Sequence, residues 1–273
     1  MPATPAWPPK SAPRLFVAET LAAGLVVRIE GNPAHYLTRV MRAAPGDIVI
    51  LCDDVTGEWL SRVTQVDKRR VDLMVERNLK PRESVPDFWL CSALLKKDRF
   101  DLVLEKAAEL GVARIQPVLT RRCVADKLNL DRARSILTEA AEQCARTALP
   151  ELVEPVKLAT MLRTIHECPK PVIARIHGPA FAGGVGLVAA CDIAVGTPAV
   201  GFSLSEVKLG LTPATISPYV LRAIGERAAR RYIVTAERFD AAQAHHLGLL
   251  HEVVEPDVLD ATVDKLVQAI IAN

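Results

Sequence analysis

The order of extended and helical segments constrains the fold of this chain more than any other feature of its sequence. From Arg14 to about Leu79, apolar residues occur in short β-branched runs, and Gly, Pro and Asn interrupt them where tight turns are expected. One helical piece, residues 33–42, stands among these runs. Short strands at this spacing favour a small barrel. The strand candidates are RLFVAE, VVRIEG, DIVILCD, EWLSRVTQV and RVDLMVE.

The pattern changes after residue 80, first in the segment KPRESVPD, which suits a linker. Strands and helices then alternate: FWLCSALL and ARIQPVLT are apolar strands, and RFDLVLEKAAELG and DRARSILTEAAEQCARTAL have apolar residues at helical spacing. Gly111 stands where a left-handed residue would end the first helix. Asn129 or Asp131 is the N-cap of the second. Alternation of this kind predicts a partial α/β sheet with parallel strands.

A third stretch begins near residue 158. LATMLRTIHE is helical, PVIARIHG is a strand, and AFAGGVGLVAAC is rich in glycine and then apolar. DIAVG and VGFSL are strands, and ATISPYVLRAIG, ERAARRYIVT and DAAQAHHLG are helices. The fold class predicted for the whole chain is therefore α/β with a small N-terminal β-barrel.

Charge and cysteine usage exclude few functions. The first 157 residues carry 24 basic and 21 acidic residues, hence +3, and the remainder carries 10 and 11, hence −1. So small an excess does not identify a nucleic-acid-binding protein. The six cysteines form no C-x-x-C pair and have no histidine at metal-ligand spacing, so we expect free buried thiols, no metal and a cytoplasmic location.

Two further expectations concern the N-terminus and membranes. Met1 to Pro13 is rich in proline and has no apolar signal-peptide core, so it is expected to be a flexible tail. No uninterrupted apolar run approaches the ~20 residues needed to cross a bilayer, and no membrane association is expected.

Six motifs in the first part of the chain follow one another in the order and spacing of a known family. They are PRLFV, HYLTRVMR, APGD, LLKKDRFDLVLEKAAELGV, ARIQPVLTRR and EAAEQCARTALPEL. On these motifs, residues 14 to about 158 resemble the 16S rRNA (uracil-N3)-methyltransferase E family. The resemblance implies a PUA-like RNA-binding barrel at 14–79 and the N-terminal half of a SPOUT methyltransferase domain at 80–157.

The same resemblance implies an activity and partners. It implies N3-methylation of a uracil in 16S rRNA with S-adenosylmethionine as methyl donor, and 16S rRNA or the small ribosomal subunit as partner. The family is usually dimeric, so a homo-oligomer is expected. The chain carries neither the GPEGG-type loop nor the later LG-x-R-I-L-R-x-E-T-A-like segment that hold the cofactor in this family. The cofactor-binding residues are therefore unknown, and the cofactor site is expected to be missing.

Basic residues in the first part are the candidates for RNA contact. Arg14, Arg39 and Arg42 lie in the barrel segment, and Arg39 and Arg42 are three apart on the expected helix, so they would share a face. An arginine fork fits phosphate oxygens and positions RNA without reading its sequence. Lys96, Lys97 and Arg99 follow the end of a strand, where α/β sheets usually hold ligands. The alternative for each set is an ordinary solvated basic surface.

Three motifs in the last part of the chain have the order of a second family. They are CPKPVIARIHGPAFAGGVGLVAACDIAVGT, FSLSEVKLGLTPATISPYVLRAIG and AERFDAAQAHHLGLLHEVV. On these motifs, residues 158 to about 260 resemble the crotonase (enoyl-CoA hydratase) superfamily, in particular its methylglutaconyl-CoA hydratase-like members. The resemblance implies a crotonase-like fragment at 158–273, an acyl-CoA thioester as substrate and a partial crotonase-type α/β core.

The crotonase resemblance also implies two catalytic residues. Gly183 aligns with one of the two backbone N–H donors that stabilise the thioester enolate. Glu206 aligns with one of the two glutamates that handle water and proton, and Gly186 stands at the position of the other. The first half of that family, with the second oxyanion donor, has no counterpart here.

Three functional hypotheses remain open on the sequence. The chain is an rRNA methyltransferase whose C-terminal half completes a cofactor site, an enoyl-CoA hydratase or isomerase completed by other parts, or an inactive fusion that keeps RNA affinity. The junction between the two resemblances lies within about Val156 to His166, where KLATMLRTIHE fits either family. Because the two halves lack their usual partners, we expect two or three loosely docked units.

Overall fold

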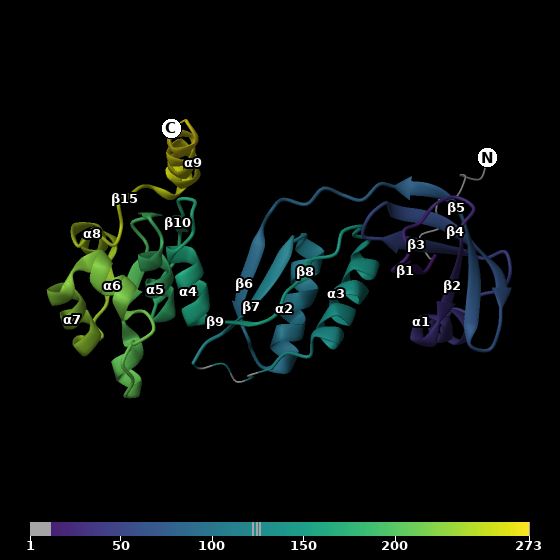
Figure 1. The fold of residues 1–273 in the computed structure, drawn as a ribbon, viewed down its shortest axis with the longest axis horizontal. Helices are drawn as coiled ribbons and strands as arrows, with labels where there is room; N and C mark the ends of the chain where they lie inside the picture. Colours follow the sequence, from purple (N-terminus) through teal and green to yellow (C-terminus); the bar gives the residue numbers. More distant parts are fainter. Residues whose placement is uncertain (1–11, 122, 124, 126, 273) are drawn as a thin grey trace. The chain divides into compact units, whose positions relative to one another are not determined.

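The structure is a computed structural model that describes residues 12–121, 123, 125 and 127–272. The expected flexible tail therefore lies almost wholly outside the described residues. The chain forms two compact units, Met1–Pro155 and Val156–Asn273, and each is described by itself (Figure 1). No helix in the described part of the chain combines the length and apolarity needed to cross a membrane.

The first unit begins with a curved five-stranded sheet in the order β1-β3-β4-β5-β2. β1 and β3 run parallel and the other neighbours antiparallel. Every second residue of β2 is buried, as expected for a strand with one face on a core. The predicted barrel strands are present as a half-barrel with β1 and β2 at its edges. Their bounds are Arg14–Phe16 (β1), Val26–Glu30 (β2), Ile48–Asp53 (β3), Gly57–Val66 (β4) and Arg70–Lys80 (β5).

The helical piece of the half-barrel ends earlier than the sequence suggests. α1 covers Gly31–His35 and continues into a π-helical turn, η1, at Tyr36–Val40. Arg42 follows with a positive φ of 54°, and the Ala43 N–H donates to the Leu37 carbonyl over it at 2.9 Å. This left-handed residue terminates the helix. The expectation that Arg39 and Arg42 share a helical face is therefore wrong, because Arg42 lies beyond the helix.

A small parallel sheet with two helices completes the first unit. β6, β7 and β8 pair in that order, and α2 and α3 lie side by side against them around a core that includes Phe100, Leu104, Ile115 and Leu137 (Figure 1). This is the alternation predicted from the sequence. The bounds are Trp89–Ala93 (β6), Lys97–Leu110 (α2), Arg114–Leu119 (β7), Leu130–Cys144 (α3) and Glu151–Leu152 (β8).

Both predicted helix boundaries in this part have a local cause. Gly111 ends α2 with φ 76°, a left-handed conformation that favours glycine, and a Cβ there would displace the guanidinium group of Arg146. Of the two N-cap candidates for α3, Asn129 is the cap, since its side-chain oxygen accepts from the Arg132 N–H at 3.0 Å.

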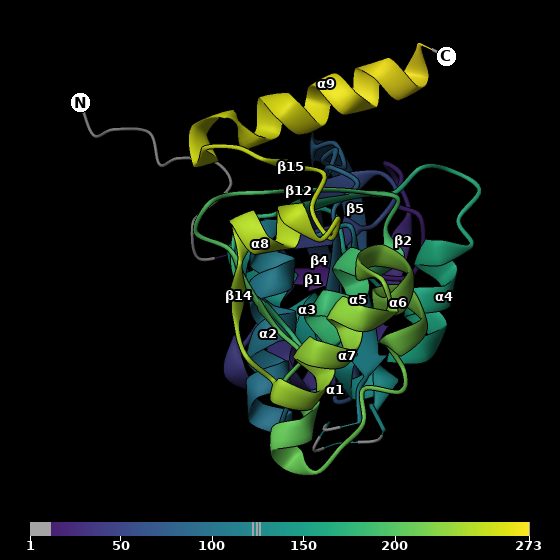
Figure 2. The same ribbon diagram turned by 90° about the vertical axis from the view of Figure 1, so that its left-hand side faces the viewer.

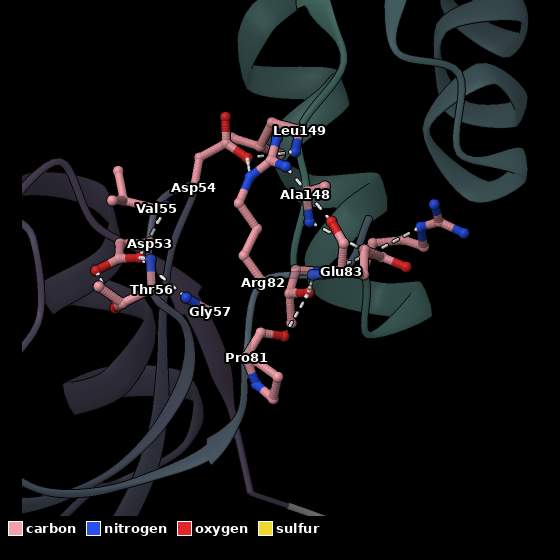
Figure 3. A network of polar contacts seen from close by, with 12 residues as sticks. Asp53, Asp54, Val55, Thr56, Gly57, Pro81, Arg82, Glu83, Ala148 and Leu149 are labelled. Carbon is pink, nitrogen blue, oxygen red and sulfur yellow. Dashed lines mark hydrogen bonds and ion pairs between the residues drawn. The ribbon is translucent and has the colours of Figure 1, made fainter. Parts of the chain in front are cut away.

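A polar network joins the half-barrel to the small sheet within the first unit (Figure 3). Asp54 accepts hydrogen bonds from Arg82 Nε at 3.0 Å and from the Leu149 N–H at 2.9 Å. Glu83 Oε1 accepts from the Thr147 N–H at 2.8 Å, and the Glu83 N–H donates to the fully buried Thr147 hydroxyl at 2.9 Å. The segment expected to be a linker is therefore fixed in place rather than loose.

The second unit contains two separate three-stranded sheets, β10-β12-β15 and β11-β13-β14. All neighbours are parallel except β13 and β14. The strands of these two sheets are Ile173–Ile176 (β10), Ala180–Phe181 (β11), Ile193–Gly196 (β12), Gly201–Ser203 (β13), Phe239–Asp240 (β14) and Glu252–Val253 (β15). The two-residue strand Val156–Lys157 (β9) at the start of the unit belongs to neither sheet.

Helices surround these sheets (Figure 2). The α-helices are Leu158–His166 (α4), Gly183–Ala190 (α5), Ser217–Ile224 (α6), Glu226–Thr235 (α7), Ala241–His246 (α8) and Leu259–Ile271 (α9), and the 3-10 turns are Ser205–Leu209 (η2) and Pro256–Val258 (η3). α9 was not predicted from the sequence.

The helix at the expected junction has a clear place in the fold. Leu162 of α4 is fully buried in the core of the second unit, and Leu158 and Ile165 pack against that core. Phe202 and Tyr232 are among the larger side chains of the same core. The segment that fits either family on sequence therefore packs as part of the second unit.

Candidate functional site

The second unit brings Gly183 and Glu206 to one edge of a sheet. β11 and β13 are parallel neighbours in which Phe181 pairs with Ser203, and the Ala182 N–H donates to the Ser203 carbonyl at 2.9 Å. α5 starts at Gly183, two residues after the end of β11, and η2 starts at Ser205, two residues after the end of β13. Both residues therefore follow the carboxyl ends of adjacent strands, where parallel sheets usually hold ligands.

Glu206 carries a carboxylate oxygen without a partner. Its Oε2 atom is buried, and it accepts no hydrogen bond from any described residue. Leaving a buried carboxylate oxygen unsatisfied costs free energy, so such an atom in a native fold calls for an explanation. A donor from a substrate, or a proton in transfer, would satisfy it.

Gly183 lies at the first position of α5, where helical N–H groups have no partner inside the helix. Ala182 before it has φ 49° and ψ −117°, a conformation that residues with a side chain rarely adopt. A Cβ on Gly183 would stand 3.0 Å from Cδ2 of Leu158. Glycine thus allows α4 to approach the start of α5, and the strained residue before it turns the chain from strand to helix.

Gly186 cannot be replaced by the second glutamate in this packing. It is buried in α5, and a Cβ there would stand 2.2 Å from Cγ2 and 2.7 Å from Cβ of Ile216, which is itself 2% exposed. Ile216 precedes α6 and therefore fills the space that a second carboxylate would need. Glu206 is the one acid or base candidate that the aligned positions provide.

The predicted RNA-binding arginines of the half-barrel fall into two groups. Arg14 is held by the buried carboxylate of Glu58, to which its Nη2 donates at 2.9 and 3.0 Å. Arg39 and Arg42 are exposed, and the described residues offer neither of them a hydrogen-bond or ion-pair partner. The Arg14 guanidinium is therefore held in an ion pair with Glu58 within the sheet, whereas the guanidinium groups of Arg39 and Arg42 remain available to an external anion.

The half-barrel has other exposed side chains that an external ligand could reach, and these were not identified from the sequence. Tyr36, at the start of η1, is 41% exposed. Lys68 and Arg69 form the exposed turn between β4 and β5, and no described residue pairs with them. The run KRR at 68–70 and the tyrosine three positions before Arg39 were the signals that could have identified them.

The other three predicted residues lie at the start of α2. Lys96 is its N-cap, and Lys97 and Arg99 occupy its first turn. All three are exposed. Lys97 also lines a pocket of about 340 Å³ that lies between the beginnings of α2 and α3.

The residues present do not fit a resident S-adenosylmethionine. The glycine-rich stretch Gly178–Gly184 leads into α5 in the second unit, where a Cβ added to Gly183 would stand 3.0 Å from Leu158 Cδ2 and one added to Gly184 would stand 3.6 Å from Ala180 Cβ. It does not form a loop on the β6-β7-β8 sheet. The residues that the structure describes therefore include no identified binding site for the cofactor expected from the first resemblance.

The described residues contain no cluster of side chains suited to metal binding. Among the described residues, no group of three or more His, Cys, Asp or Glu side chains could hold a metal ion. The six cysteines are free, but Cys91, Cys144 and Cys168 are exposed, so the expectation that all are buried is wrong. Burial raises the pKa of Cys52 to about 12, which makes that thiol unreactive.

Comparison with known proteins gives two separate matches. Residues 140–273 match the enoyl-CoA hydratase/isomerase family, and residues 29–76 match the RNA methyltransferase PUA domain. One part of the chain is thus similar to RNA methyltransferases and another part to enoyl-CoA hydratases. Both resemblances seen in the sequence are thus confirmed, although the hydratase match begins in α3, before the junction expected at 156–166.

Individual relatives repeat this division. Enoyl-CoA hydratase ACTT6 of Alternaria alternata is 36% identical over 171 residues, which cover 62% of this chain and 53% of that protein. Ribosomal RNA small subunit methyltransferase E of Synechocystis is 28% identical over 224 residues, covering 77% of this chain and 73% of that protein. The chain spans about half the length of the hydratases it matches first.

A solved structure supports the fold of the methyltransferase-like part. Ribosomal RNA small subunit methyltransferase E from Neisseria gonorrhoeae, bound to S-adenosyl methionine, superposes with a TM-score of 0.53 at 25% identity, covering 61% of this chain and 69% of that one. The chain is therefore related both to rRNA methyltransferases and to enoyl-CoA hydratases, and the hydratase match is the stronger of the two.

Proposed function

We propose that the first unit binds RNA of the small ribosomal subunit through its half-barrel. The observation that carries the proposal is the pair of exposed, unpartnered guanidinium groups of Arg39 and Arg42 at the end of the helical piece. The relatives named ribosomal RNA small subunit methyltransferase E supply the class of partner. The proposed domains are the barrel at 14–79, the partial sheet at 80–157 and the crotonase-like fragment at 158–273.

The chemistry of this surface suits RNA. Guanidinium forks pair with phosphate oxygens in a geometry that lysine does not match. Unpaired bases stack on exposed aromatic rings, and Tyr36, three residues before Arg39 in the sequence, offers one. Phosphate contacts and stacking together give affinity with little sequence selectivity.

Methyl transfer is not part of the proposal, since the chain has no identified site for the methyl donor. The proposed role is retention of RNA by a unit of methyltransferase descent, in the cytoplasm, with a homo-oligomer as the proposed assembly. This role corresponds to the third hypothesis drawn from the sequence, an inactive fusion that keeps RNA affinity, and it concerns the first unit.

Fluorescence anisotropy tests the proposal on the full chain. A labelled fragment of 16S rRNA is titrated with the wild-type protein and with the double variant Arg39→Gln/Arg42→Gln. Two lost phosphate contacts of about 1 to 2 kcal/mol each predict a fall in affinity of roughly 30-fold or more.

The matched control is Arg227→Gln/Arg230→Gln, which removes two exposed arginines of α7 in the second unit. It should bind RNA as the wild type does. Equal losses in the two double variants would mean that the RNA responds to net charge alone, and the proposed surface would then be wrong.

A second candidate function rests on the unpartnered Glu206 oxygen. We propose that the second unit retains part of a thioester site, in which the Gly183 N–H polarises the carbonyl oxygen and the Glu206 carboxylate moves one proton. Glu206 is the single carboxylate that we propose for this site, because Ile216 fills the space that a second one would need. The substrate class is an acyl-CoA thioester, as the names of the hydratase relatives suggest.

A hydration and isomerisation assay with short-chain enoyl-CoA tests this candidate. Turnover that Glu206→Gln lowers by about a hundredfold or more, while Glu226→Gln on the surface of α7 leaves it unchanged, supports the site. Absence of turnover in the wild type, or equal turnover in both variants, removes the candidate without touching the RNA proposal.

A further inference from the structure

The pocket of about 340 Å³ in the first unit belongs to neither proposed site. It lies where α2 and α3 begin, at the carboxyl end of β6. Leu94, Phe100 and Ala133, each no more than 3% exposed, contribute apolar lining. Lys97, Lys127 and Asn129 supply exposed polar groups at the same pocket.

Basic side chains outnumber acidic ones in the lining of this pocket. Arg132 donates to both carboxylate oxygens of Asp101, at 3.1 and 2.7 Å, and this pair neutralises itself. Lys97 and Lys127 have no partner among the described residues. The pocket therefore has, next to its apolar lining, two ammonium groups without an ion-pair partner among the described residues.

The Asn129 side chain adds a directional donor. Its Oδ1 is used as the N-cap of α3, where it accepts the Arg132 N–H. The carboxamide N–H₂ group is thereby left to donate to a ligand. A carbonyl oxygen of a nucleotide base is one acceptor that this amide group can serve.

We propose that this pocket binds one nucleotide, with the base on the apolar lining, a base carbonyl on Asn129 and the phosphate on Lys97 and Lys127. The volume lies at the small end of ligand pockets, which suits one nucleotide better than a dinucleotide or coenzyme A. S-adenosylmethionine is a poor fit, since its sulfonium and ammonium groups would meet two lysines. The nucleotide is either free or one residue of an RNA chain, and in the second case the inference rests on the proposed RNA binding.

Isothermal titration calorimetry of the full chain with uridine 5′-monophosphate tests the proposal. Uridine alone and inorganic phosphate alone should each bind at least about tenfold more weakly, because each fills half of the pocket. Lys97→Gln/Lys127→Gln should weaken nucleotide binding by about tenfold or more, and Lys265→Gln on α9 should not change it.

Asn129→Asp is the second variant and keeps the fold, because aspartate caps a helix as well as asparagine does. It removes the amide donor and adds a negative charge, so it should weaken binding at least as much as the lysine pair. No binding of the nucleotide, or unchanged binding in both variants, overturns the proposal.

Competition separates the two sources and the two proposals. Displacement of labelled RNA by the mononucleotide, lost in the lysine variant, identifies an RNA residue as the ligand, and nucleotide binding without displacement identifies a free one. Arg39→Gln/Arg42→Gln should leave mononucleotide affinity unchanged. RNA binding without nucleotide binding would contradict only the proposed nucleotide pocket. Nucleotide binding without RNA binding would contradict only the proposed RNA-binding function.

Discussion

Asp53 is the residue whose replacement tests the packing of the first unit most severely. It ends β3, is 2% exposed, and accepts hydrogen bonds from four residues. Three of them, Val55, Thr56 and Gly57, are labelled in Figure 3. Oδ2 takes the Leu21 N–H at 2.6 Å and the Thr56 hydroxyl at 2.7 Å. Oδ1 takes the N–H groups of Val55 at 2.9 Å, of Gly57 at 3.1 Å and of Thr56.

Asp53→Asn changes one atom of this arrangement. The new amide nitrogen stands in place of Oδ2, where it faces the Leu21 N–H, donor against donor. Leu21 is buried, so its N–H loses its partner at a cost of about 1 to 3 kcal/mol. The bonds to Oδ1 survive but lose their charge, which adds about 1 kcal/mol. We expect a total loss near 3 kcal/mol and a drop in melting temperature of roughly 6 to 12 °C for a unit of this size.

The pH dependence gives the same variant a second readout. Burial alone would raise the pKa of Asp53, but the hydrogen bonds from Leu21 and Thr56 outweigh it and lower the pKa. A lowered pKa in the folded state means stabilisation above the unfolded value of about 3.9, lost as pH falls through the folded pKa. The deficit of Asp53→Asn should therefore be full at pH 7 and shrink below about pH 3.9.

Urea denaturation followed by circular dichroism measures this deficit at each pH. Asp131→Asn is the control, since that side chain is almost fully exposed at the start of α3. An unfolding midpoint equal to that of the control at pH 7 would refute the reasoning. A deficit that persists unchanged in acid would show that geometry, and not the charge of Asp53, causes it.

Three further predictions concern single positions. Gly186→Ala should destabilise the second unit by about 1 to 3 kcal/mol in urea melts because of Ile216, whereas Gly201→Ala, whose Cβ meets no atom within 4 Å, should cost less than half as much. Ala182→Gly should be neutral or stabilise by up to about 1 kcal/mol, unlike an ordinary Ala→Gly change, because it relieves a positive φ; a clear loss of stability would contradict the strain. Burial raises the pKa of Glu142, so the folded state favours its protonated form and loses stability as pH rises above about 4.3. Glu142→Gln should therefore stabilise at pH 7 and lose this advantage below pH 4 in thermal melts.

Local sequence rules predicted the elements of the first unit because they depend on neighbouring residues. Gly111 and Asn129 bound their helices as predicted, since a left-handed C′ residue and an N-cap act within one turn. Arg42 escaped the same rules, because a non-glycine residue with positive φ leaves no pattern in the sequence.

Long-range partners could not be predicted in the same way. The pairing of Arg14 with Glu58 and the fixed position of Arg82 depend on residues 44 and 28 positions away in the sequence. The obstruction of Gly186 by Ile216 likewise needs the packing of α5 against α6. The resemblances identified Gly183 and Glu206, but only the structure shows a buried carboxylate oxygen that lacks a partner.

The salt dependence of RNA binding tests the central claim most directly. The affinity of the full chain for a single-stranded 16S rRNA fragment is measured between low and moderate salt, for the wild type and for Arg39→Gln/Arg42→Gln. Each lost phosphate contact on a single strand lowers the slope of log affinity against log salt by about 0.7, so the account predicts a decrease near 1.4. A slope that is the same in both proteins would contradict the claim that the half-barrel arginines hold RNA.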